Sequence, residues 1–445
     1  MRKEESEKKV IWNEINTKMG SLHLSDPEKH LIKQEIFHKE AENLRSRRRR
    51  ISVFDFEPLV IIGKGAFGEV RLVRNKLTGE IQAMKKMSKQ EMIKKNQIMH
   101  VRAERNVLAF AENPWIVDLK YSFQDENSLF LVMEYVPGGD LMTVLMKRDI
   151  LPENEARFYI AELVSAVESV HKMNYIHRDL KPDNVLIDKR GHIKLSDFGL
   201  CKNTAVVGVT IGDVVSLAGG GGGGRRNGEE IGVTRDGEHK RSRVLAYSTV
   251  GTPDYIAPEV FSKQGYNESA DWWSVGVILF EMVVGYPPFY ADEPNLTCQK
   301  ILNWKKTLAI PREAGLSKET SDLIKRLVCD ANERLGSRGA QEIKNHPFFK
   351  GIQWETLRDS KAPWIPKLSS EIDTSNFDKY EETEPFYPQV KRKKAKKDSD
   401  FSGYTFKKPE DNIKSHLVRA LQELENFKSG PQRKASVPLR FNIYE

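Results

Sequence analysis

A group of charged and amide side chains between residues 177 and 199 has the types and spacing that phosphoryl transfer requires. The run His-Arg-Asp-Leu-Lys-Pro-Asp-Asn is followed by a short apolar strand pattern and by Asp-Phe-Gly. Phosphoryl transfer needs a carboxylate that orients the attacking hydroxyl and oxygen ligands that hold Mg²⁺ against the phosphates. We therefore predict that Asp179 takes the first role and that Asn184 and Asp197 hold the metal ion. Lys181, in the same loop, belongs to the predicted catalytic set.

A glycine-rich segment lies well ahead of this loop. It follows the apolar run from Leu59 to Ile62 and precedes a second strand pattern, Glu69 to Arg74, rather than a helix. The same glycine spacing occurs in dinucleotide-binding folds, but a helix follows it there. Without side chains, glycines let backbone N–H groups approach phosphates closely. The predicted nucleotide-binding hairpin comprises Ile62, Gly63, Lys64, Gly65, Ala66, Phe67, Gly68, Glu69 and Val70.

A lysine and a glutamate complete the predicted phosphate site. Lys85 ends the run Gln-Ala-Met-Lys, which begins about fifteen residues after the hairpin, where a kinase places the lysine of its third strand. We expect Lys85 to contact the α- and β-phosphates and to need a carboxylate partner on the next helix. Glu104, in the predicted helix from His100 to Phe110, is the best-placed candidate. The alternative is that both are ordinary surface charges.

Other segments are expected to position these groups. The stretch from Asp271 to Val284 is apolar nearly all round, which is typical of a helix buried in a large domain. Asp271 is predicted to brace the backbone of the catalytic loop. Glu259, in Ala-Pro-Glu, is predicted to pair with Arg334 in a structural role.

Taken together, these motifs resemble the serine/threonine protein kinases of the AGC group, and within it the NDR/LATS family, nearest the NDR branch. Lys181 gives the loop its serine/threonine form, and the segment from Tyr247 to Glu259, with the long insert before it, carries the closer match. The resemblance covers about residues 25 to 406. It implies an α+β, bilobal kinase fold with a small β-rich N-lobe and a larger α-helical C-lobe, and ATP and Mg²⁺ as cofactors.

The resemblance also implies a domain organisation. Residues 56–349 would form the catalytic domain, and residues 350–408 the C-terminal extension of AGC kinases, which wraps the N-lobe. Met133, Glu134 and Val136 match the hinge, whose backbone groups read adenine. Phe377, in the extension, is the residue most expected to touch adenine.

Three acidic positions match those that bind basic residues upstream of the target hydroxyl in related kinases. They are Asp140, Asp183 and Glu281. Pairs between arginine and carboxylates add both strength and register to such recognition. We therefore expect protein substrates that carry basic residues before the phosphorylated Ser or Thr.

The N-terminal residues 1–55 form a separate basic region that is helical in pattern. Ser25-Asp26-Pro27-Glu28 reads as a helix start, and Leu31, Ile32, Ile36, Phe37 and Leu44 recur at helical spacing. In the NDR/LATS family this region binds an acidic MOB coactivator, and a coiled coil is among its expected features. The alternative is a solvated helix that merely packs against the N-lobe.

Regulation is expected at two phosphorylation sites. Ser248 lies in the activation segment, beside the competing Thr249, and Thr405 lies in residues 401–406, which resemble the AGC hydrophobic motif. The resemblance implies an upstream kinase for Thr405. The glycine-rich insert at about 202–243 is read as either an autoinhibitory segment or a disordered spacer, and residues 409–445 as an amphipathic or disordered tail.

Composition limits the function classes. The 445 residues include 39% hydrophobic and 30% charged residues, and no apolar run approaches a membrane span. The three cysteines are isolated, which favours a reducing compartment, either the cytoplasm or the nucleus. The net charge of +8 arises in the tails and insert without interleaved aromatics, so nucleic acid is an unlikely partner.

Two other functions remain open from the sequence. One is a pseudokinase scaffold, which the intact set of predicted catalytic residues disfavours. The other is an AGC kinase of another type, without MOB regulation. Binding of a MOB protein by residues 1–50 would distinguish these kinase types.

Overall fold

The computed structural model describes residues 2–21, 25–65, 67–111, 113–203, 253–261, 266–382, 385–387 and 400–408. The chain divides into two units. One comprises residues 1–51 and 407–445, and the other comprises residues 52–406.

The first unit contains two long helices, α1 (Arg2–Ser21) and α2 (Asp26–Arg48). They contact each other through Trp12 and Phe37, whose rings stack with centroids 5.0 Å apart. Ile32 of the predicted apolar stripe is buried, whereas Leu31 and Phe37 are 54% and 58% exposed. The stripe is therefore only partly covered, because two helices bury a narrow strip of each other's surface.

The second unit begins with the short helix η1 (Val53–Asp55) and a mainly antiparallel sheet. The strand order in the sheet is β1-β2-β3-β5-β4-β10. The strands are β1 (Phe56–Gly65), β2 (Gly68–Asn75), β3 (Ile81–Ser88), β4 (Leu119–Gln124), β5 (Ser128–Glu134) and β10 (Phe406–Lys407). Helices α3 (Lys89–Lys94) and α4 (Ile98–Phe110) follow β3. The inner strand β5 is buried without interruption over residues 128–132, whereas the edge strand β1 buries only Phe56 and Ile61.

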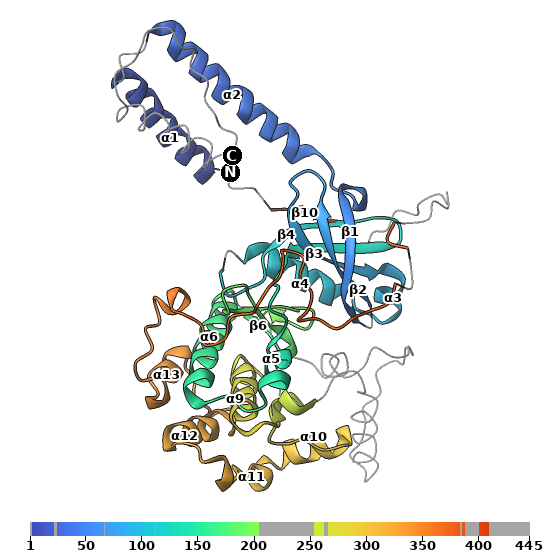
Figure 1. Ribbon diagram of the computed structural model, residues 1–445, viewed down its shortest axis with the longest axis vertical. Helices are drawn as coiled ribbons and strands as arrows, with labels where there is room; N and C mark the ends of the chain where they lie inside the picture. The colour runs from blue at the N-terminus through green and yellow to red at the C-terminus, as the bar shows by residue number, and fades with distance from the viewer. Residues whose placement is uncertain are drawn as a thin grey trace, which may run out of the picture. The chain divides into compact units, whose positions relative to one another are not determined.

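A mainly helical part follows the sheet and lies below it in Figure 1. Its α-helices are α5 (Leu141–Arg148), α6 (Glu153–Lys172), α9 (Ser269–Val284), α10 (Pro294–Leu302), α11 (Trp304–Thr307), α12 (Lys318–Leu327) and α13 (Ala340–Lys344). Its short 3-10 helices are η2 (Pro182–Asn184), η3 (Pro253–Tyr255), η4 (Pro258–Phe261), η5 (Arg312–Ala314), η6 (Pro347–Phe349) and η7 (Leu357–Asp359). Two small two-stranded sheets pair β6 (Tyr175–Ile176) with β9 (Lys202–Asn203) and β7 (Val185–Ile187) with β8 (Ile193–Leu195), and only β7 and β8 follow each other as a hairpin. This β-rich part and helical part confirm the predicted kinase fold.

Helix α9 is the centre of the helical part, and every residue from Ser269 to Val284 is buried. At Gly276, a Cβ atom would lie 2.7 Å from Cβ of Leu327, so only glycine lets α12 approach α9 this closely. The buried helix expected from the sequence is confirmed. It provides the rigid base on which the catalytic loop rests.

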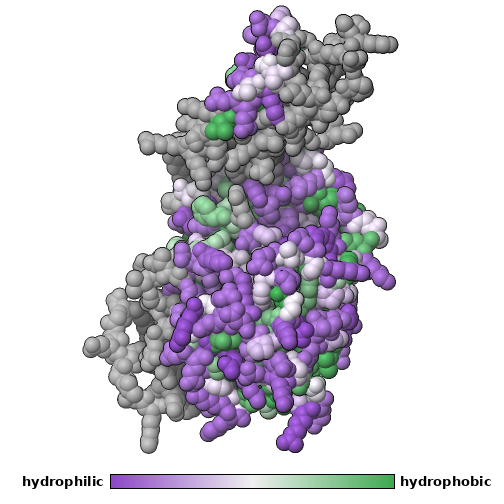
Figure 2. Space-filling model, turned by 90° about the vertical axis from the view of Figure 1, so that its left-hand side faces the viewer, coloured by the Kyte–Doolittle hydropathy of each residue, from purple (hydrophilic) through white to green (hydrophobic). Residues whose placement is uncertain are grey.

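The surface matches the polar composition. On the face drawn in Figure 2, the described residues are mostly hydrophilic, and hydrophobic ones are scattered in small groups. Within the described ranges, no helix is both long enough and apolar enough to cross a membrane.

Candidate active site

The glycine-rich segment forms the turn of the hairpin between β1 and β2. Gly63 pairs with Val70, Lys64 with Glu69, and Gly65 with Gly68. A Cβ atom on Gly68 would lie 1.8 Å from the carbonyl oxygen of Lys86, so this position must stay glycine for β2 to pair with β3. The predicted hairpin is thus present, with Ala66 outside the described residues.

Lys85 lies at the centre of a charged cluster. Its Nζ atom is 2.7 Å from Oε1 of Glu104 and 3.7 Å from Oδ1 of Asp197. Burial alone would lower the pKa of Lys85, but the carboxylates of Asp197 and Glu104 overcome burial and raise it. Lys85 is therefore held as a cation, and strand β3, helix α4 and the Asp-Phe-Gly segment meet at one point.

The catalytic loop brings three predicted residues together. Nζ of Lys181 lies 3.1 Å from Oδ2 of Asp179. The side-chain amide of Asn184 donates to the backbone oxygen of Asp179 at 2.8 Å and to its Oδ2 at 2.9 Å. Burial raises the pKa of Asp179, and the ammonium group of Lys181 opposes that rise. Asn184 thus orients the Asp179 carboxylate, and Lys181 partly offsets its charge.

Asp271 at the start of α9 braces this loop, as predicted. Its carboxylate accepts the backbone N–H groups of His177 and Arg178, both at 2.9 Å, and contacts Nε2 of His171 at 2.8 Å. Arg178 and Asp197 both have left-handed backbone conformations, with φ of 69° and 53°. Such conformations cost energy in non-glycine residues and persist where the surroundings enforce them.

Asn184 and Asp197 have oxygen atoms suited to a magnesium ion. Lys85 lowers the pKa of Asp197, so this carboxylate is charged at neutral pH. The amide nitrogen of Asn184 is used by Asp179, and its oxygen can serve as a ligand. Within the described residues, no group of three or more His, Cys, Asp or Glu could hold a metal. Two protein ligands fit Mg²⁺ well, because this ion usually takes its other ligands from phosphates and water.

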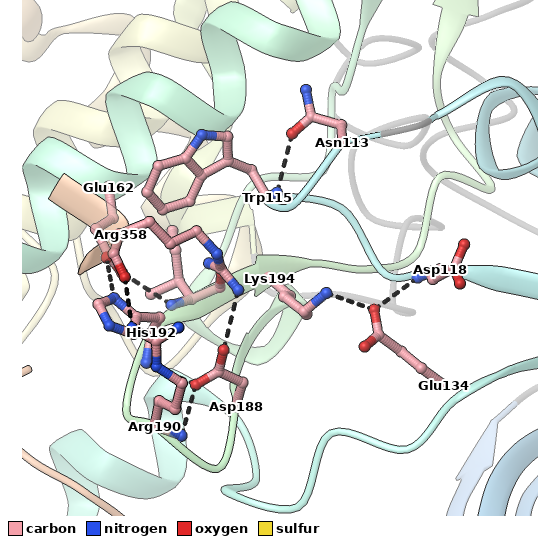
Figure 3. Close-up of polar contacts among 11 residues, drawn as sticks. Asn113, Trp115, Asp118, Glu134, Glu162, Asp188, Arg190, His192, Lys194 and Arg358 are labelled. Atoms are coloured by element: carbon pink, nitrogen blue, oxygen red, sulfur yellow. Dashed lines mark hydrogen bonds and ion pairs between the residues drawn. The ribbon is translucent and has the colours of Figure 1, made fainter. Parts of the chain in front are cut away.

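The hinge begins at the end of β5, where Glu134 is held by the Lys194 side chain on one side and by the backbone of Asp118 on the other. The N–H of Glu134 donates to the carbonyl of Asp118 at 2.9 Å, so adenine contacts would come from other hinge backbone groups. Figure 3 shows that the Glu134 carboxylate accepts hydrogen bonds from Lys194 and from the backbone of Asp118. Met133 and Val136, the other predicted hinge residues, lie next to it and are half-buried and buried.

The C-terminal extension passes beside the hinge. Phe377 lies against Tyr135 with ring centroids 5.9 Å apart, and the Tyr135 hydroxyl donates to the carbonyl of Asp373 at 2.5 Å. The predicted adenine contact, Phe377, is therefore close to the hinge. The same extension reaches the glycine-rich hairpin, where Nζ of Lys64 donates to the carbonyl of Glu381 at 2.6 Å.

The three predicted substrate-binding acids differ in their surroundings. Asp140 caps α5 by accepting the N–H of Thr143 at 2.7 Å. Glu281 is 6% exposed and accepts a hydrogen bond of 2.7 Å from the Tyr255 hydroxyl. Burial raises the pKa of Glu281 to about 7, and Asp183 contributes to this rise. Glu281 is thus poised to change its charge near neutral pH.

The hydrophobic motif is docked on the N-lobe beside α4. Phe401 and Tyr404 are 0% and 1% exposed. Ser122 in β4 donates to the carbonyl of Tyr404 at 2.6 Å, and Arg105 in α4 donates to that of Gly403 at 2.8 Å. Phe401 and Tyr404 therefore fill a groove beside α4 and β4, while Thr405 is exposed.

Several predictions fall on residues that the structure does not describe. Ser248, Thr249, residues 204–252 of the activation segment and its insert, and residues 409–445 lie outside the described ranges.

The sequence reasoning missed the side chains that hold the hinge and the extension. Lys194 and Glu134 are 60 positions apart, and Arg71 pairs with Glu382 over 311 positions. No local pattern links such pairs. The one available signal was that Lys194 is a charged residue within a predicted apolar strand, where it proves to be half-buried.

Comparison with known proteins agrees with this geometry. The protein kinase domain model matches residues 56–210 and 231–349 and skips part of the glycine-rich insert. The chain is 49% identical over 413 residues to the probable serine/threonine-protein kinase ndrB of Dictyostelium discoideum, covering 88% of this chain and 76% of that one. It is 47% identical over 389 residues to the serine/threonine-protein kinase CBK1 of Pneumocystis carinii, covering 83% and 77%.

A third relative comes from an animal. The chain is 44% identical over 420 residues to the serine/threonine-protein kinase tricornered of Drosophila melanogaster, covering 90% of this chain and 89% of that one. The matched region includes the glycine-rich hairpin, the catalytic loop and the Asp-Phe-Gly segment. The chain therefore belongs to the protein kinase family and is a serine/threonine protein kinase of the NDR type.

Proposed function

We propose that this kinase transfers the γ-phosphate of ATP, bound with Mg²⁺, to Ser or Thr in proteins that carry basic residues upstream of the target. The observation that carries the proposal is the cluster in which Lys85 contacts Glu104 at 2.7 Å and Asp197 at 3.7 Å. One cation and two carboxylates of the proposed phosphate site are thus brought together at one point. A scaffold without activity would have no need of this arrangement.

Each residue of the cluster has a role in the proposed reaction. Lys85, kept cationic and oriented by Glu104, neutralises the α- and β-phosphates. Asp179 accepts a hydrogen bond from the attacking hydroxyl and orients it, while Lys181 offsets the charge that develops nearby. Bound to Asn184 and Asp197, Mg²⁺ would neutralise phosphate charge.

The nucleotide would lie between the glycine-rich hairpin and the hinge. Backbone N–H groups of Gly63, Gly65 and Gly68 would face the phosphates, and hinge backbone groups near Val136 would face adenine. Phe377 supports this assignment, because it reaches the hinge from the C-terminal extension.

The substrate class is inferred from the acidic residues of the cleft. Burial raises the pKa of Asp140, and the nearby carboxylates of Asp183 and Asp378 also raise it. A concentration of carboxylates around one site favours arginine or lysine in the bound peptide. Protein substrates with basic residues before the phosphorylated Ser or Thr satisfy this requirement.

We assign residues 56–349 to the catalytic domain and residues 350–408 to the regulatory extension. Docking of Phe401 and Tyr404 supports regulation through the hydrophobic motif, because the motif contacts the helix that carries Glu104. A phosphate on Thr405 would add a charge of about −1.5 to −2, which nearby basic groups such as Arg102 and Arg105 can pair with. An upstream kinase would modify Thr405, and autophosphorylation would modify Ser248.

The N-terminal region would bind a MOB-type coactivator. Residues 1–50 contain 13 Lys and Arg against 9 Asp and Glu, and five of the arginines lie between residues 45 and 50. Leu31 and Phe37 leave apolar surface exposed on α2. Basic charge beside exposed apolar side chains suits an acidic partner.

The proposal is tested by phosphate transfer to a peptide with arginines upstream of one serine. The wild-type chain should phosphorylate it in the presence of ATP and Mg²⁺, and Asp179→Asn should abolish transfer. Asp322→Asn is the matched control, because Asp322 pairs with Arg326 on α12, in the helical part. Wild-type rates in Asp179→Asn would refute the proposed active site, and an inactive wild-type chain that still binds partners would favour a scaffold.

A further inference from the structure

We propose that Lys194 is a positioning residue for nucleotide binding, because its ion pair with Glu134 ties the hinge to the strand that leads into Asp197. The inference rests on the proposed nucleotide site. Figure 3 shows Lys194 extending from the β7–β8 hairpin toward Glu134, with Asp118 on the other side of the same carboxylate.

Two donors converge on one oxygen atom of Glu134. Nζ of Lys194 lies 2.6 Å from Oε1, and the backbone N–H of Asp118 donates to the same atom at 2.8 Å. The Lys194 and Glu134 side chains are 13% and 26% exposed. A charge-assisted contact of this length, largely removed from water, is stronger than an ordinary surface pair.

The backbone continues the same connection. Leu195 in β8 donates its N–H to the carbonyl of Trp115 at 2.7 Å, and Val117 donates to the carbonyl of Leu195 at 3.0 Å. The N–H of Glu134 then donates to the carbonyl of Asp118 at 2.9 Å. The segment 115–118 therefore lies between β8 and the hinge and is hydrogen-bonded to both.

The hairpin that carries Lys194 is itself fixed on α6. The buried carboxylate of Glu162 contacts Nδ1 of His192 at 2.5 Å and accepts the N–H of Ile193 at 2.9 Å. Because the backbone beside Lys194 is already fixed, less conformational entropy is lost when the ion pair forms.

The C-terminal extension holds the same hairpin from another side. Arg358 donates to the carbonyl of Ile193 and to Oδ2 of Asp188, both at 2.9 Å, and its guanidinium lies 5.0 Å from the centroid of the Trp115 ring. Ile193, just before Lys194, is thus anchored both by α6 and by the C-terminal extension, and Leu195, just after it, by the segment 115–118. Lys194 offers Glu134 a fixed partner rather than a mobile surface charge.

This arrangement links the two ends of the proposed nucleotide site, the hinge and the Asp197 segment, to each other. Asp197 follows β8 by two residues, and Glu134 begins the hinge. The ion pair therefore sets the position of the adenine site relative to the phosphate site. Lys194 does not contact Asp179, so its loss should weaken nucleotide binding more than the chemical step.

The test uses the full chain with Lys194→Met, which keeps the length of the side chain and removes the charge. The matched control is Lys344→Met. Lys344 forms an ion pair with Glu168 at the same 2.6 Å and the same 13% exposure, and also lies over Trp354, but it joins α13 to α6. KM for ATP, kcat, the Kd for Mg-ADP and the Tm are measured for each protein.

We expect Lys194→Met to raise KM for ATP and the Kd for Mg-ADP by about five- to tenfold, with kcat changed less than about twofold. Lys344→Met should lower Tm without changing either nucleotide constant. Lys194→Arg should retain nearly wild-type nucleotide affinity, because its guanidinium can pair with Glu134.

Lys194→Gln provides a second variant, which removes the charge but keeps a polar side chain. Its KM for ATP should also rise. Unchanged nucleotide constants in Lys194→Met or Lys194→Gln, with Tm lowered as in Lys344→Met, would overturn the inference and leave a purely structural pair. A fall in kcat at constant KM would overturn it too. A wild-type chain that binds no Mg-ADP would contradict the proposed function instead.

Discussion

Arg105 directly follows Glu104, the residue that pairs with Lys85, and its guanidinium donates a hydrogen bond of 2.8 Å to the carbonyl of Gly403. The hydrophobic motif is thus attached to the helix turn that positions Glu104. Arg102, on the same helix, donates to the carbonyl of Asp400 at 2.6 Å. Both bonds go to backbone atoms, one in the motif and one in the residue just before it, so a phosphate on Thr405 would add to contacts that already exist.

Thr405→Ala should lower kinase activity severalfold, because the exposed Thr405 could no longer carry a phosphate that pairs with arginines of α4. Activity is measured on protein isolated from cells, and phosphorylation sites are mapped by mass spectrometry. Ser402→Ala serves as the control, since Ser402 is an exposed hydroxyl of the same turn. Full activity in Thr405→Ala, with no phosphate found at Thr405, would contradict this account of regulation.

Asp179→Asn and Asp197→Ala should both abolish phosphate transfer but should differ in nucleotide binding. Loss of Asp179 removes a group that orients the hydroxyl, so we expect kcat to fall by about 10²–10⁴-fold with the Kd for Mg-ATP nearly unchanged. Loss of Asp197 removes a metal ligand, so the Kd for Mg-ATP should rise. Calorimetric titration distinguishes the two variants. An equal loss of Mg-ATP affinity in both would show that the roles are misassigned.

Recognition of basic peptides should strengthen as pH rises from 6 to 8. Burial raises the pKa of Glu281 to about 7, so the side chain is mostly neutral at pH 6 and mostly anionic at pH 8. Arginine binds the anionic form, and KM for an arginine-containing peptide should fall by about three- to tenfold over this interval. In Glu281→Gln, KM should be higher at pH 8 and nearly independent of pH. A wild-type KM that rises with pH would contradict the assignment.

Neutralising the arginines at positions 45 and 47–50 to glutamine should weaken MOB binding and make the remaining affinity less dependent on salt. Opposite charges attract less strongly as ionic strength rises, so the wild-type affinity should fall between low and physiological salt. Basal activity without MOB should not change. The matched control replaces Lys391, Arg392, Lys393, Lys394 and Lys396 with glutamine, which removes the same number of charges elsewhere. Equal MOB affinity in both variants would exclude the N-terminal arginines as the site.

The catalytic centre was predictable because its residues lie in short motifs. Asp179 and Asn184 are five positions apart, and Gly63, Gly65 and Gly68 lie within six residues. Local spacing together with the neighbouring strand patterns therefore identifies them. Helix α9 was predictable from continuous hydrophobicity. The hinge contact of Lys194 was not, because its partner is 60 positions away and a lone lysine in a strand has no characteristic spacing.

The apolar stripe on α2 shows a different limit of sequence reasoning. Helical periodicity correctly placed Ile32 on a buried face, but it also included Leu31 and Phe37, which remain exposed. Periodicity identifies the face that can be buried, whereas the amount of burial depends on which surfaces are present to cover it.

The docked hydrophobic motif also constrains how the protein can be made. Ser122 in β4 donates a hydrogen bond to the carbonyl of Tyr404, 282 positions later, so the groove is filled by side chains that the ribosome adds long after β4. Until then, the growing chain exposes the apolar surface that Phe401 and Tyr404 later cover. Domains generally fold as units during translation, so we expect the N-lobe to be completed only after residues 401–404 have been added.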